Sequence, residues 1–303
     1  MIKNFKKIVI KIGSNSIVDS KTKKIKSKWL DKLCKDIAQL HKAKKIVIVC
    51  SGAIALGSKS ISNSTLRKLE DKQAAASIGQ IELAYQWRTK LKKFKINVSQ
   101  ILLTLEDSEV RHRYLNARNT ISSLQNKHII PIINENDTVA TEEIRYGDND
   151  KLAARVAQMI GADLLVLLSD VDGLYEDNPK KITGAKKISE IYNIDKKIEN
   201  LAKSQTSALG SGGMTTKIIA AKICSNNNCT TVITNSNKNN PVSTIDIKNS
   251  TFFYPSTSTN SSKKKWLLNH LKPSGSFIID DGARNAILKN KSLLPAGIVE
   301  IRG

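Results

Sequence analysis

The chain has 303 residues, of which 40% are hydrophobic and 25% are charged, so it can bury the core of one large α/β domain or of two smaller ones, and disorder along its whole length is excluded. No segment approaches the roughly 18 to 20 consecutive apolar residues that a membrane-spanning helix needs, which predicts a soluble, cytoplasmic protein. The formal net charge is +22, but the lysines are spread along the whole chain, which favours a compositional bias of solvated positions over a nucleic-acid surface.

The first elements predict a strand–helix–strand unit. Residues 7–12 and 45–50 are almost continuous apolar runs that end at Gly13 and at Ser51-Gly52. Between them, apolar side chains recur at helical spacing over 29–40. Strands that are apolar on both faces are typical of a parallel sheet covered by helices.

The alternation of helices and strands continues along the chain. Helices are predicted over 66–94, around 115–121, over 152–160 and over 214–225, and strands over 98–103, 129–133, 163–168 and 230–234. This succession predicts a three-layer α/β/α sandwich around one large, open and mainly parallel sheet.

The C-terminal part of the chain differs in composition. Between 235 and 265 the sequence shifts to Asn, Ser, Thr and Lys, with one short strand candidate at 252–254. We therefore predict a domain at 1–258, a linker at 259–271 and a separate segment at 272–303. That segment contains a strand, a short helix and an apolar run, but about thirty residues cannot bury a core alone. We expect it to dock on the main domain or on a partner, or to begin a larger module.

Several motifs of other site types are incomplete. Gly52–Gly57 has the glycine spacing of a P-loop, but a serine follows where that loop needs its lysine. Residues 170–173 lack the glycine position and the closing glutamate of a calcium loop, and 210–213 lack the third glycine of a dinucleotide fingerprint. The cysteines fit neither a zinc pattern nor a disulfide scaffold, and Cys34 and Cys50 are predicted to be buried thiols. No metal site built from protein ligands is predicted.

The carboxyl ends of the predicted strands carry the informative residues, because ligands bind there in open α/β sheets. Small or amide-bearing residues follow apolar strands at 11–14, 51–53, 134–137 and 169–170, and two further polar segments open helices at 147–151 and 210–217. The first of these segments could grip an ammonium group or orient a lysine, and the second is a glycine-rich, anion-binding loop that delivers a lysine. Each motif alone fits an ordinary turn or helix cap. Together they predict a phosphoryl-transfer site without a P-loop.

These motifs resemble the glutamate 5-kinase family of the amino acid kinase superfamily. The resemblance covers essentially all of residues 5 to 300 and rests on Lys11-Ile12-Gly13-Ser14, Ser51-Gly52-Ala53-Ile54, Ile132 to Asp137, Gly147-Asp148-Asn149-Asp150 and Gly210 to Lys217. Ser169 and Asn15 stand where threonine and serine are commoner in the family. The segment from Lys272 resembles the beginning of a PUA domain, but the chain stops before such a domain would be complete.

The resemblance implies the amino acid kinase fold and a transferase that uses ATP, with Mg²⁺, to phosphorylate the γ-carboxylate of L-glutamate to L-glutamyl 5-phosphate, the first step of proline biosynthesis. It also implies inhibition by proline and a homo-oligomer. By position, it implies that Lys11 and Lys217 stabilise the transferring phosphoryl group and that Asp150 orients both lysines. The resemblance also implies three sets of contacts. Glutamate is bound by Ser51, Asn134, Asp137, Asp148 and Asn149, and the phosphate is bound by the backbone N–H groups of Gly13, Ser14 and Gly52. The nucleotide is bound by Ser169, Asp170, Ser211, Gly212, Gly213, Met214, Thr215, Thr216 and Lys217.

The chemistry of that reaction suits these residue types. A carboxylate with a pKa of ~4.3 is already ionised at neutral pH, so it needs no general base to act as a nucleophile. The site must instead bring two anions together and neutralise the charge on the phosphoryl oxygens. Lysines, backbone N–H groups and Mg²⁺ can do this.

Two alternatives stay open at this stage. Kinases of the same superfamily that act on acetylglutamate, aspartate, carbamate or uridylate usually carry a Gly-Gly pair after the first strand or a different substrate block. A basic RNA-binding protein could use the PUA-like tail while the kinase fold is inert. Such a protein would have no need of Lys11, Asp150 and Lys217, and all three are present.

Overall fold

The computed structural model describes residues 2–61, 68–139, 149–177, 179, 182, 184–204, 213–255, 275–289 and 291–302. The chain forms two compact units, Met1–Asn260 and Ser261–Gly303. Asp148, Ser211, Gly212 and the predicted linker at 259–271 lie outside the described residues. No helix in the described part of the chain is both long enough and apolar enough to cross a membrane.

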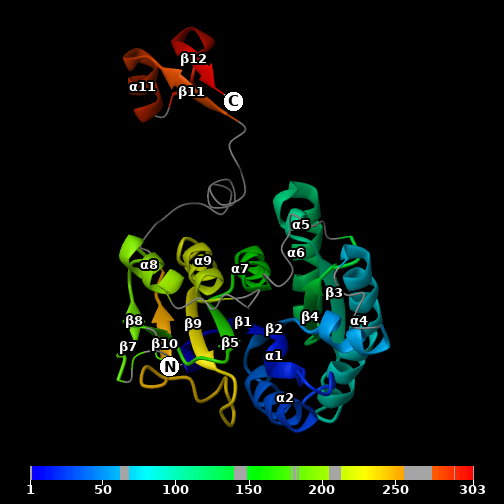
Figure 1. Ribbon diagram of the computed structural model, residues 1–303. Coiled ribbons are helices and arrows are strands. Elements are labelled where there is room, and N and C mark those ends of the chain that lie inside the picture. Colours follow the sequence, from blue (N-terminus) through cyan, green and yellow to red (C-terminus); the bar gives the residue numbers. More distant parts are fainter. Residues whose placement is uncertain are drawn as a thin grey trace. The chain divides into compact units, whose positions relative to one another are not determined.

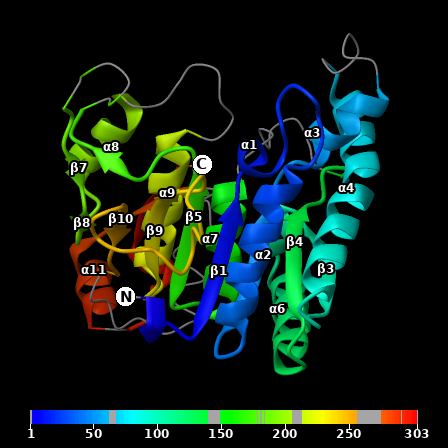
Figure 2. The same ribbon diagram turned by 90° about the horizontal axis from the view of Figure 1, so that it is seen from below.

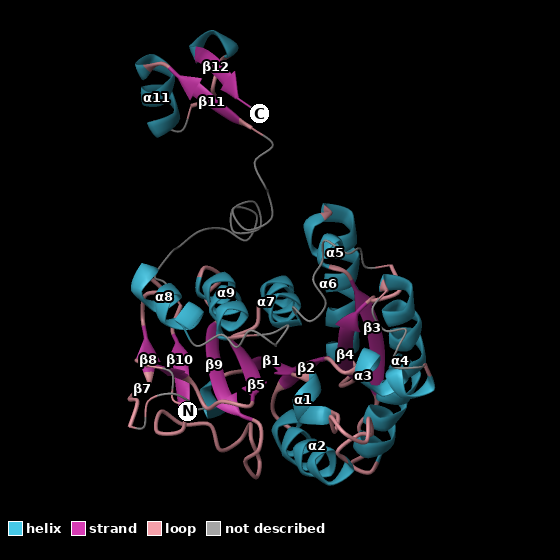
Figure 3. Ribbon diagram, in the orientation of Figure 1, coloured by secondary structure: helices cyan, strands magenta, loops and turns pink. Residues whose placement is uncertain are grey.

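The first unit is built on an eight-stranded sheet in the order β3-β4-β2-β1-β5-β9-β10-β8 (Figure 3). Neighbouring strands pair in parallel except for β9 and β10, which are antiparallel. The predicted large, mainly parallel sheet is therefore confirmed. The strands are β1 (Lys7–Ile12), β2 (Lys45–Cys50), β3 (Val98–Leu103), β4 (Ile130–Glu135), β5 (Leu164–Ser169), β8 (Glu190–Ile191), β9 (Thr230–Asn235) and β10 (Ser250–Phe253).

Helices cover both faces of this sheet, as expected for strands that are apolar throughout. Figure 1 shows α7 (Asn149–Ile160), α8 (Lys196–Ser204) and α9 (Met214–Ser225) on one face, with α6 (Arg111–Asn126) packed on α7. The other face carries α2 (Ser27–His41) and α4 (Leu69–Lys92). Ile10 of β1 and Val166 of β5 are completely buried between the two helical layers. Cys34 and Cys50 are buried as predicted.

Short helices begin where the strands end. Helices α1 (Ser14–Ile17), α3 (Ala53–Gly57) and α5 (Leu105–Glu109) follow β1, β2 and β3, and Figure 2 shows α1 and α3 at the same edge of the sheet. Gly52 turns the chain from β2 into α3 with φ of +113°, a conformation that side chains disfavour. The remaining short elements of this unit are η1 (Ile2–Asn4), η2 (Ser58–Ser60), β6 (Leu174–Tyr175) and β7 (Lys187–Ile188).

Helix α3 packs on α4 at very short range through two glycines. A Cβ atom on Gly57 would lie 1.8 Å from the carbonyl oxygen of Ala75, and one on Gly79 would lie 1.9 Å from the carbonyl oxygen of Ala53. Both contacts are with backbone atoms, which cannot move aside without shifting a helix. The glycines therefore fix the distance between α3 and α4, and the position of α4 along its axis relative to the end of β2.

The second unit contains the elements predicted for the tail. A two-stranded antiparallel sheet of β11 (Ser276–Ile279) and β12 (Ile298–Arg302) is joined through α11 (Asp281–Leu288) and η3 (Pro295–Gly297). The carboxylate of Asp280 caps α11 by accepting a hydrogen bond from the backbone N–H of Ala283. Apolar side chains on both strands stay exposed, including Phe277 and Ile301, which face each other across the pair.

Candidate active site

Two lysines and one aspartate form a buried charged cluster at the carboxyl edge of the sheet. Lys11 reaches it from β1, Lys217 from the first turns of α9, and Asp150 from the first turn of α7. The Nζ atoms of Lys11 and Lys217 lie 2.6 Å and 3.1 Å from the two carboxylate oxygens of Asp150. Asp150 is completely buried, and each lysine is about 5% exposed. The structure thus brings together three residues that are far apart in the sequence.

The electrostatics of the cluster favour full ionisation. Burial alone would raise the pKa of Asp150, but the two ammonium groups, with a hydrogen bond donated by the hydroxyl of Thr216 at 2.8 Å, hold that pKa well below its ordinary value. One carboxylate between two ammonium groups leaves a net positive charge in a dry environment. Such a charge attracts a phosphoryl group and costs no reorganisation when the group arrives.

Small residues surround this positive charge. Gly13 and Ser14 follow β1 directly, and a Cβ atom on Gly13 would stand 3.9 Å from Nζ of Lys11. Gly52 follows β2, which pairs with β1 in register from Lys7↔Lys45 to Ile12↔Cys50. The backbones of Gly13, Ser14 and Gly52 therefore lie at the ends of adjacent strands, next to Lys11.

A row of neutral side chains begins next to the cluster, at Asn149. Nδ2 of Asn149, the residue before Asp150, donates to Oγ of Ser51 at 2.6 Å and to Oδ1 of Asn134 at 3.2 Å. Nδ2 of Asn134 in turn donates to Oε1 of Gln80 at 2.7 Å. We call Ser51, Asn149, Asn134 and Gln80 the amide row. Its members come from the ends of β2, α7 and β4 and from the middle of α4.

Asp137 lies beside the amide row, and no cationic side chain among the described residues offsets its loss of solvation. It lines a cavity of about 190 Å³ together with Gln80, Asn136 and Thr138. Burial raises the pKa of Asp137 to about 6. A carboxylate that loses solvation without gaining a partner is matched to a cationic ligand, such as an ammonium group.

The predicted nucleotide residues are divided between the end of β5 and the start of α9. Ser169 ends β5, is buried, and donates a hydrogen bond from its hydroxyl to Oδ1 of Asp170 at 3.1 Å. Gly213 is the N-cap residue of α9, so Met214, Thr215 and Thr216 form the first turn of that helix just before Lys217. Asp170 is exposed, whereas Met214 is buried. The predicted contacts Asp148, Ser211 and Gly212 lie outside the described residues.

Gln80 was missed by the sequence analysis. It is 8% exposed and lies on the same face of α4 as Ala76, Leu83 and Trp87, which are buried. A polar residue at helical spacing within a buried stripe needs a partner, and this signal is readable in the sequence. The identity of the partner, Asn134, depends on the fold.

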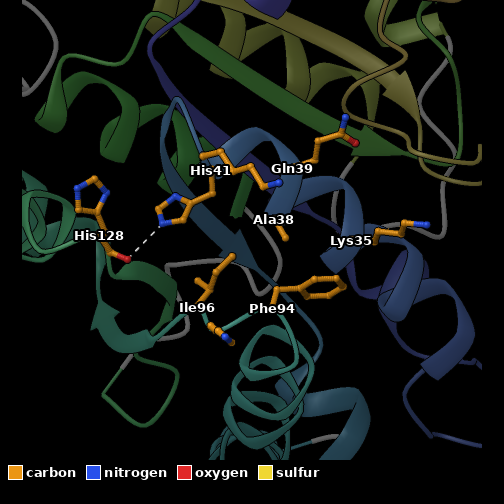
Figure 4. A pocket seen from close by; sticks show the side chains of 9 residues that line it. Lys35, Ala38, Gln39, His41, Phe94, Ile96 and His128 are labelled. Carbon is orange, nitrogen blue, oxygen red and sulfur yellow. Dashed lines mark hydrogen bonds between the residues drawn. The ribbon is translucent and has the colours of Figure 1, made fainter.

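A larger cavity, of about 640 Å³, lies away from this site. It is lined by the C-terminal end of α2 and by the turns that enter β3 and β4, at the amino ends of those strands (Figure 4). Its basic residues include Lys42 and Lys95, and a ring nitrogen of His41 is 3.2 Å from the backbone oxygen of His128. Because helix C-termini themselves attract positive charge, these side chains need no anionic ligand to explain them. We therefore assign the candidate active site to the opposite edge.

Comparisons with known proteins identify the family of the chain. Residues 6–235 match the model of the amino acid kinase family. The chain is 52% identical over 305 residues to the glutamate 5-kinase of Pelagibacter ubique (strain HTCC1062), a match that covers 100% of this chain and 83% of that protein. It is 46% identical over 300 residues to the glutamate 5-kinase of Paramagnetospirillum magneticum, covering 98% of this chain and 81% of that one.

Solved structures share the fold at low identity. The UMP kinase of Ureaplasma parvum superposes with a TM-score of 0.58 at 19% identity and covers 82% of this chain and 98% of its own. The carbamate kinase of Giardia lamblia bound to AMP-PNP superposes with a TM-score of 0.60 at 18% identity and covers 83% of this chain and 99% of its own. Both similarities concern the arrangement of the sheet and its helices.

Proposed function

The chain belongs to the amino acid kinase family and, within it, to the glutamate 5-kinases, and we propose that the charged cluster of Lys11, Asp150 and Lys217 is where it transfers a phosphoryl group. The reaction is the ATP-dependent phosphorylation of glutamate to L-glutamyl 5-phosphate, in proline biosynthesis. The observation that carries the assignment is the pair of buried ammonium groups on one buried carboxylate, at the edge of the sheet where ligands bind.

In this proposal, an oxygen of the glutamate γ-carboxylate attacks the γ-phosphorus of ATP, and the bond from that phosphorus to the bridging oxygen of ADP breaks. Lys11 and Lys217 neutralise the charge on the transferring group, and Asp150 keeps both ammonium groups aimed at it. Backbone N–H groups at Gly13, Ser14 and Gly52 assist the lysines. No residue is assigned as a general base, because the attacking carboxylate is already ionised.

The nucleotide is assigned to Ser169, Asp170 and the turn from Gly213 to Lys217, together with Ser211 and Gly212. Mg²⁺ would travel with the ATP phosphates and add positive charge between them. The described residues contain no cluster of three His, Cys, Asp or Glu side chains that could hold a metal ion.

Glutamate is assigned to the amide row and its neighbours. Asp137, with Asp148, receives the α-ammonium group, because a cation stabilises a half-buried carboxylate whose pKa is raised by desolvation. Asn134, Asn149 and Ser51 orient the substrate so that its γ-carboxylate faces Lys11. This placement favours glutamate over acetylglutamate, whose amide nitrogen carries no charge.

The test is an ATP-dependent assay with hydroxylamine, which traps acyl phosphates, run with glutamate, acetylglutamate and aspartate. We expect hydroxamate and ADP to form in equal amounts with glutamate and only background signal with the other two. Equal turnover of acetylglutamate would show that Asp137 does not bind an ammonium group. The absence of any glutamate-dependent ADP would remove the proposed function.

Proline is proposed as an inhibitor that competes with glutamate. It shares the α-carboxylate and a positively charged α-nitrogen with the substrate, so Asp137 and Asn149 could hold both molecules. Glutamate saturation curves with and without millimolar proline test this. We expect the KM for glutamate to rise with proline while kcat stays constant, and superimposable curves would contradict the proposal.

A cytoplasmic homo-oligomer is proposed as the working form. Four free, buried cysteines suit a reducing compartment. Ile78, Ile81 and Tyr85 form an exposed apolar stripe along α4, which a second copy of the chain would cover. Light scattering after size exclusion should report more than one chain per particle, and Ile81→Glu should reduce that number. A monomer in both cases would overturn this part.

A further inference from the structure

The direction of the hydrogen bonds in the amide row is fixed by a backbone carbonyl. Nδ2 of Asn149 is 3.4 Å from the carbonyl oxygen of Cys50, which can only accept a hydrogen bond. The amino group of Asn149 must therefore face Cys50, Ser51 and Asn134. It follows that Asn134 presents its oxygen to Asn149 and its amino group to Gln80.

Gln80 closes the far end of this row. Its Oε1 accepts the hydrogen bond from Asn134 at 2.7 Å, between two side chains that are 8% and 2% exposed. Without an acceptor at this position, the buried amino group of Asn134 would lose its partner, and the amide could turn over to find another. An inverted Asn134 would point its amino group at the amino group of Asn149, and the row would no longer be consistent.

The backbone holds Gln80 in place. Gly79, the preceding residue, is the point where α4 touches α3, and a Cβ atom there would lie 1.9 Å from a backbone oxygen. Because this contact leaves no room for α4 to slide, the reach of the Gln80 side chain toward Asn134 is set by the helix packing. Gln80 also lines the cavity that Asp137 lines, so it lies next to two of the residues assigned to glutamate, Asn134 and Asp137.

The row ends on the substrate side in an unused acceptor. Oδ1 of Asn149 is buried and has no hydrogen-bond partner among the described residues. An orphaned acceptor costs free energy unless a ligand supplies a donor. The α-ammonium group of glutamate is such a donor.

We propose that Gln80 is a positioning residue for glutamate, which acts through Asn134 to hold Asn149 with its oxygen toward the substrate. This inference rests on the proposed placement of glutamate against Asn149. Gln80 has no assigned contact with ATP or with the transferring phosphoryl group. Its loss should therefore weaken glutamate binding and leave ATP binding and kcat almost unchanged.

The experiment compares Gln80→Met, which keeps the shape of the side chain and removes the acceptor, with Gln80→Glu, which keeps an acceptor at the same place. Gln86→Met is the matched control, because Gln86 lies on the same helix, is half-buried and donates a hydrogen bond from Nε2 to Oε1 of Glu82 at 2.8 Å. Kinetic constants for both substrates and calorimetric titration with glutamate are measured on the full chain. Thermal unfolding checks that each variant is folded.

We expect Gln80→Met to raise the KM and the dissociation constant for glutamate about tenfold, the scale of one buried hydrogen bond and its orphaned partner. The KM for ATP and kcat should stay within about twofold, and Gln80→Glu should recover most of the glutamate affinity. Unchanged glutamate affinity in Gln80→Met, equal damage by Gln80→Glu, or equal effects on both substrates would each overturn the inference. If the unmodified chain binds no glutamate, the proposed function fails first and this inference fails with it.

Discussion

The charged cluster and the amide row meet at Asn149 and Asp150, two adjacent residues in the first turn of α7, and they are built in opposite ways. In the cluster, one carboxylate neutralises only half of the charge of two buried lysines, and the excess positive charge is the proposed functional feature. In the row, every group is neutral, and the proposed functional feature is the oxygen of Asn149, an acceptor without a partner among the described residues. In this proposal, charge acts on the phosphoryl group, and hydrogen-bond direction acts on the substrate that must be distinguished from its analogues.

This difference predicts different sensitivities. The cluster has no redundancy, because the removal of one member leaves an unpaired charge in a buried place. The members of the row are neutral, so the removal of one costs a hydrogen bond or two but leaves no unpaired charge. Substitutions in the cluster should therefore affect stability and kcat strongly, and substitutions in the row should affect the KM for glutamate moderately.

Asp150→Asn gives the largest expected effect. It leaves two buried ammonium groups facing a neutral amide, and we expect a loss of about 3–5 kcal/mol in the free energy of unfolding at pH 7. The pKa of Asp150 is lowered in the folded state, so its stabilising contribution is present above its ordinary pKa and is lost as the pH falls toward the folded value. The difference between variant and parent should accordingly shrink below pH 4.

Asp31→Asn is the control for Asp150→Asn. Asp31 also bonds two lysines, Lys90 at 2.8 Å and Lys93 at 3.2 Å, but its side chain is 43% exposed. Its removal should cost about 1 kcal/mol, because the carboxylate of Asp31 is solvated and the ammonium group of Lys90, although only 9% exposed, keeps its hydrogen bond to Oγ of Ser27. Urea unfolding of both variants and the parent measures the contrast, and equal losses would show that burial does not set the strength of the cluster.

Lys11→Ala and Lys217→Ala should each lower kcat by about 10² to 10³, the scale for the loss of one preorganised charge at a transition state. The KM for glutamate should change little, because neither lysine is assigned to the amino-acid end of the substrate. Lys222→Ala is the control on the same helix, since Lys222 is exposed and pairs with Glu199 at the surface. Full activity in Lys11→Ala would mean that the site has been placed at the wrong strand end.

Asn134→Leu tests the row at its centre. It removes the acceptor for Asn149 and the donor for Gln80 together, and two hydrogen bonds at about 1 kcal/mol each correspond to an increase of about thirtyfold in the KM for glutamate. The value of kcat should fall by less than about threefold. Asn126→Leu is the control, because Asn126 lies at the exposed end of α6. A fall in kcat of the size expected for Lys11→Ala would erase the distinction between row and cluster.

The strands of the catalytic edge could be predicted almost residue by residue, because buried parallel strands are continuous apolar runs. Strands β1, β2 and β3 begin and end where the sequence pattern places them. The edge strand β8 was missed, since its two residues pair with β10, about sixty residues later, and short strands carry no periodicity of their own. Local patterns thus predict the elements but not every pairing.

The predictability of the site follows the same division. Lys11 could be singled out because it lies at the end of a predicted strand, and the segments with Asp150 and Lys217 because they open predicted helices with glycines and charged residues. The roles of all three were implied by the family resemblance. No neighbouring motif marks Gln80 in the sequence, because it lies in the middle of a helix. Its proposed role depends on its hydrogen bond with Asn134 at the end of β4. The raised pKa of Asp137 also depends on burial, which the sequence does not show. The roles that follow from three-dimensional packing are therefore the ones that needed the structure.

The smallest expected effect is the pH dependence of glutamate binding through Asp137. Burial raises its pKa to about 6, so ionisation carries a cost as the pH rises through that value, and an incoming ammonium group offsets the cost. Glutamate should bind the ionised form, and at pH 5.5 only about a quarter of the free protein is ionised at this group, which raises the KM for glutamate about fourfold over its value at pH 8. Between these pH values the ionisable groups of glutamate do not titrate, so the change in its KM reports on the protein. Asp137→Asn should show a higher KM that no longer varies over this range. A KM that rises equally at low pH in parent and variant would show that the titrating group is not Asp137. Glutamate would then be recognised through the direction of the hydrogen bonds in the amide row and not through the charge of Asp137.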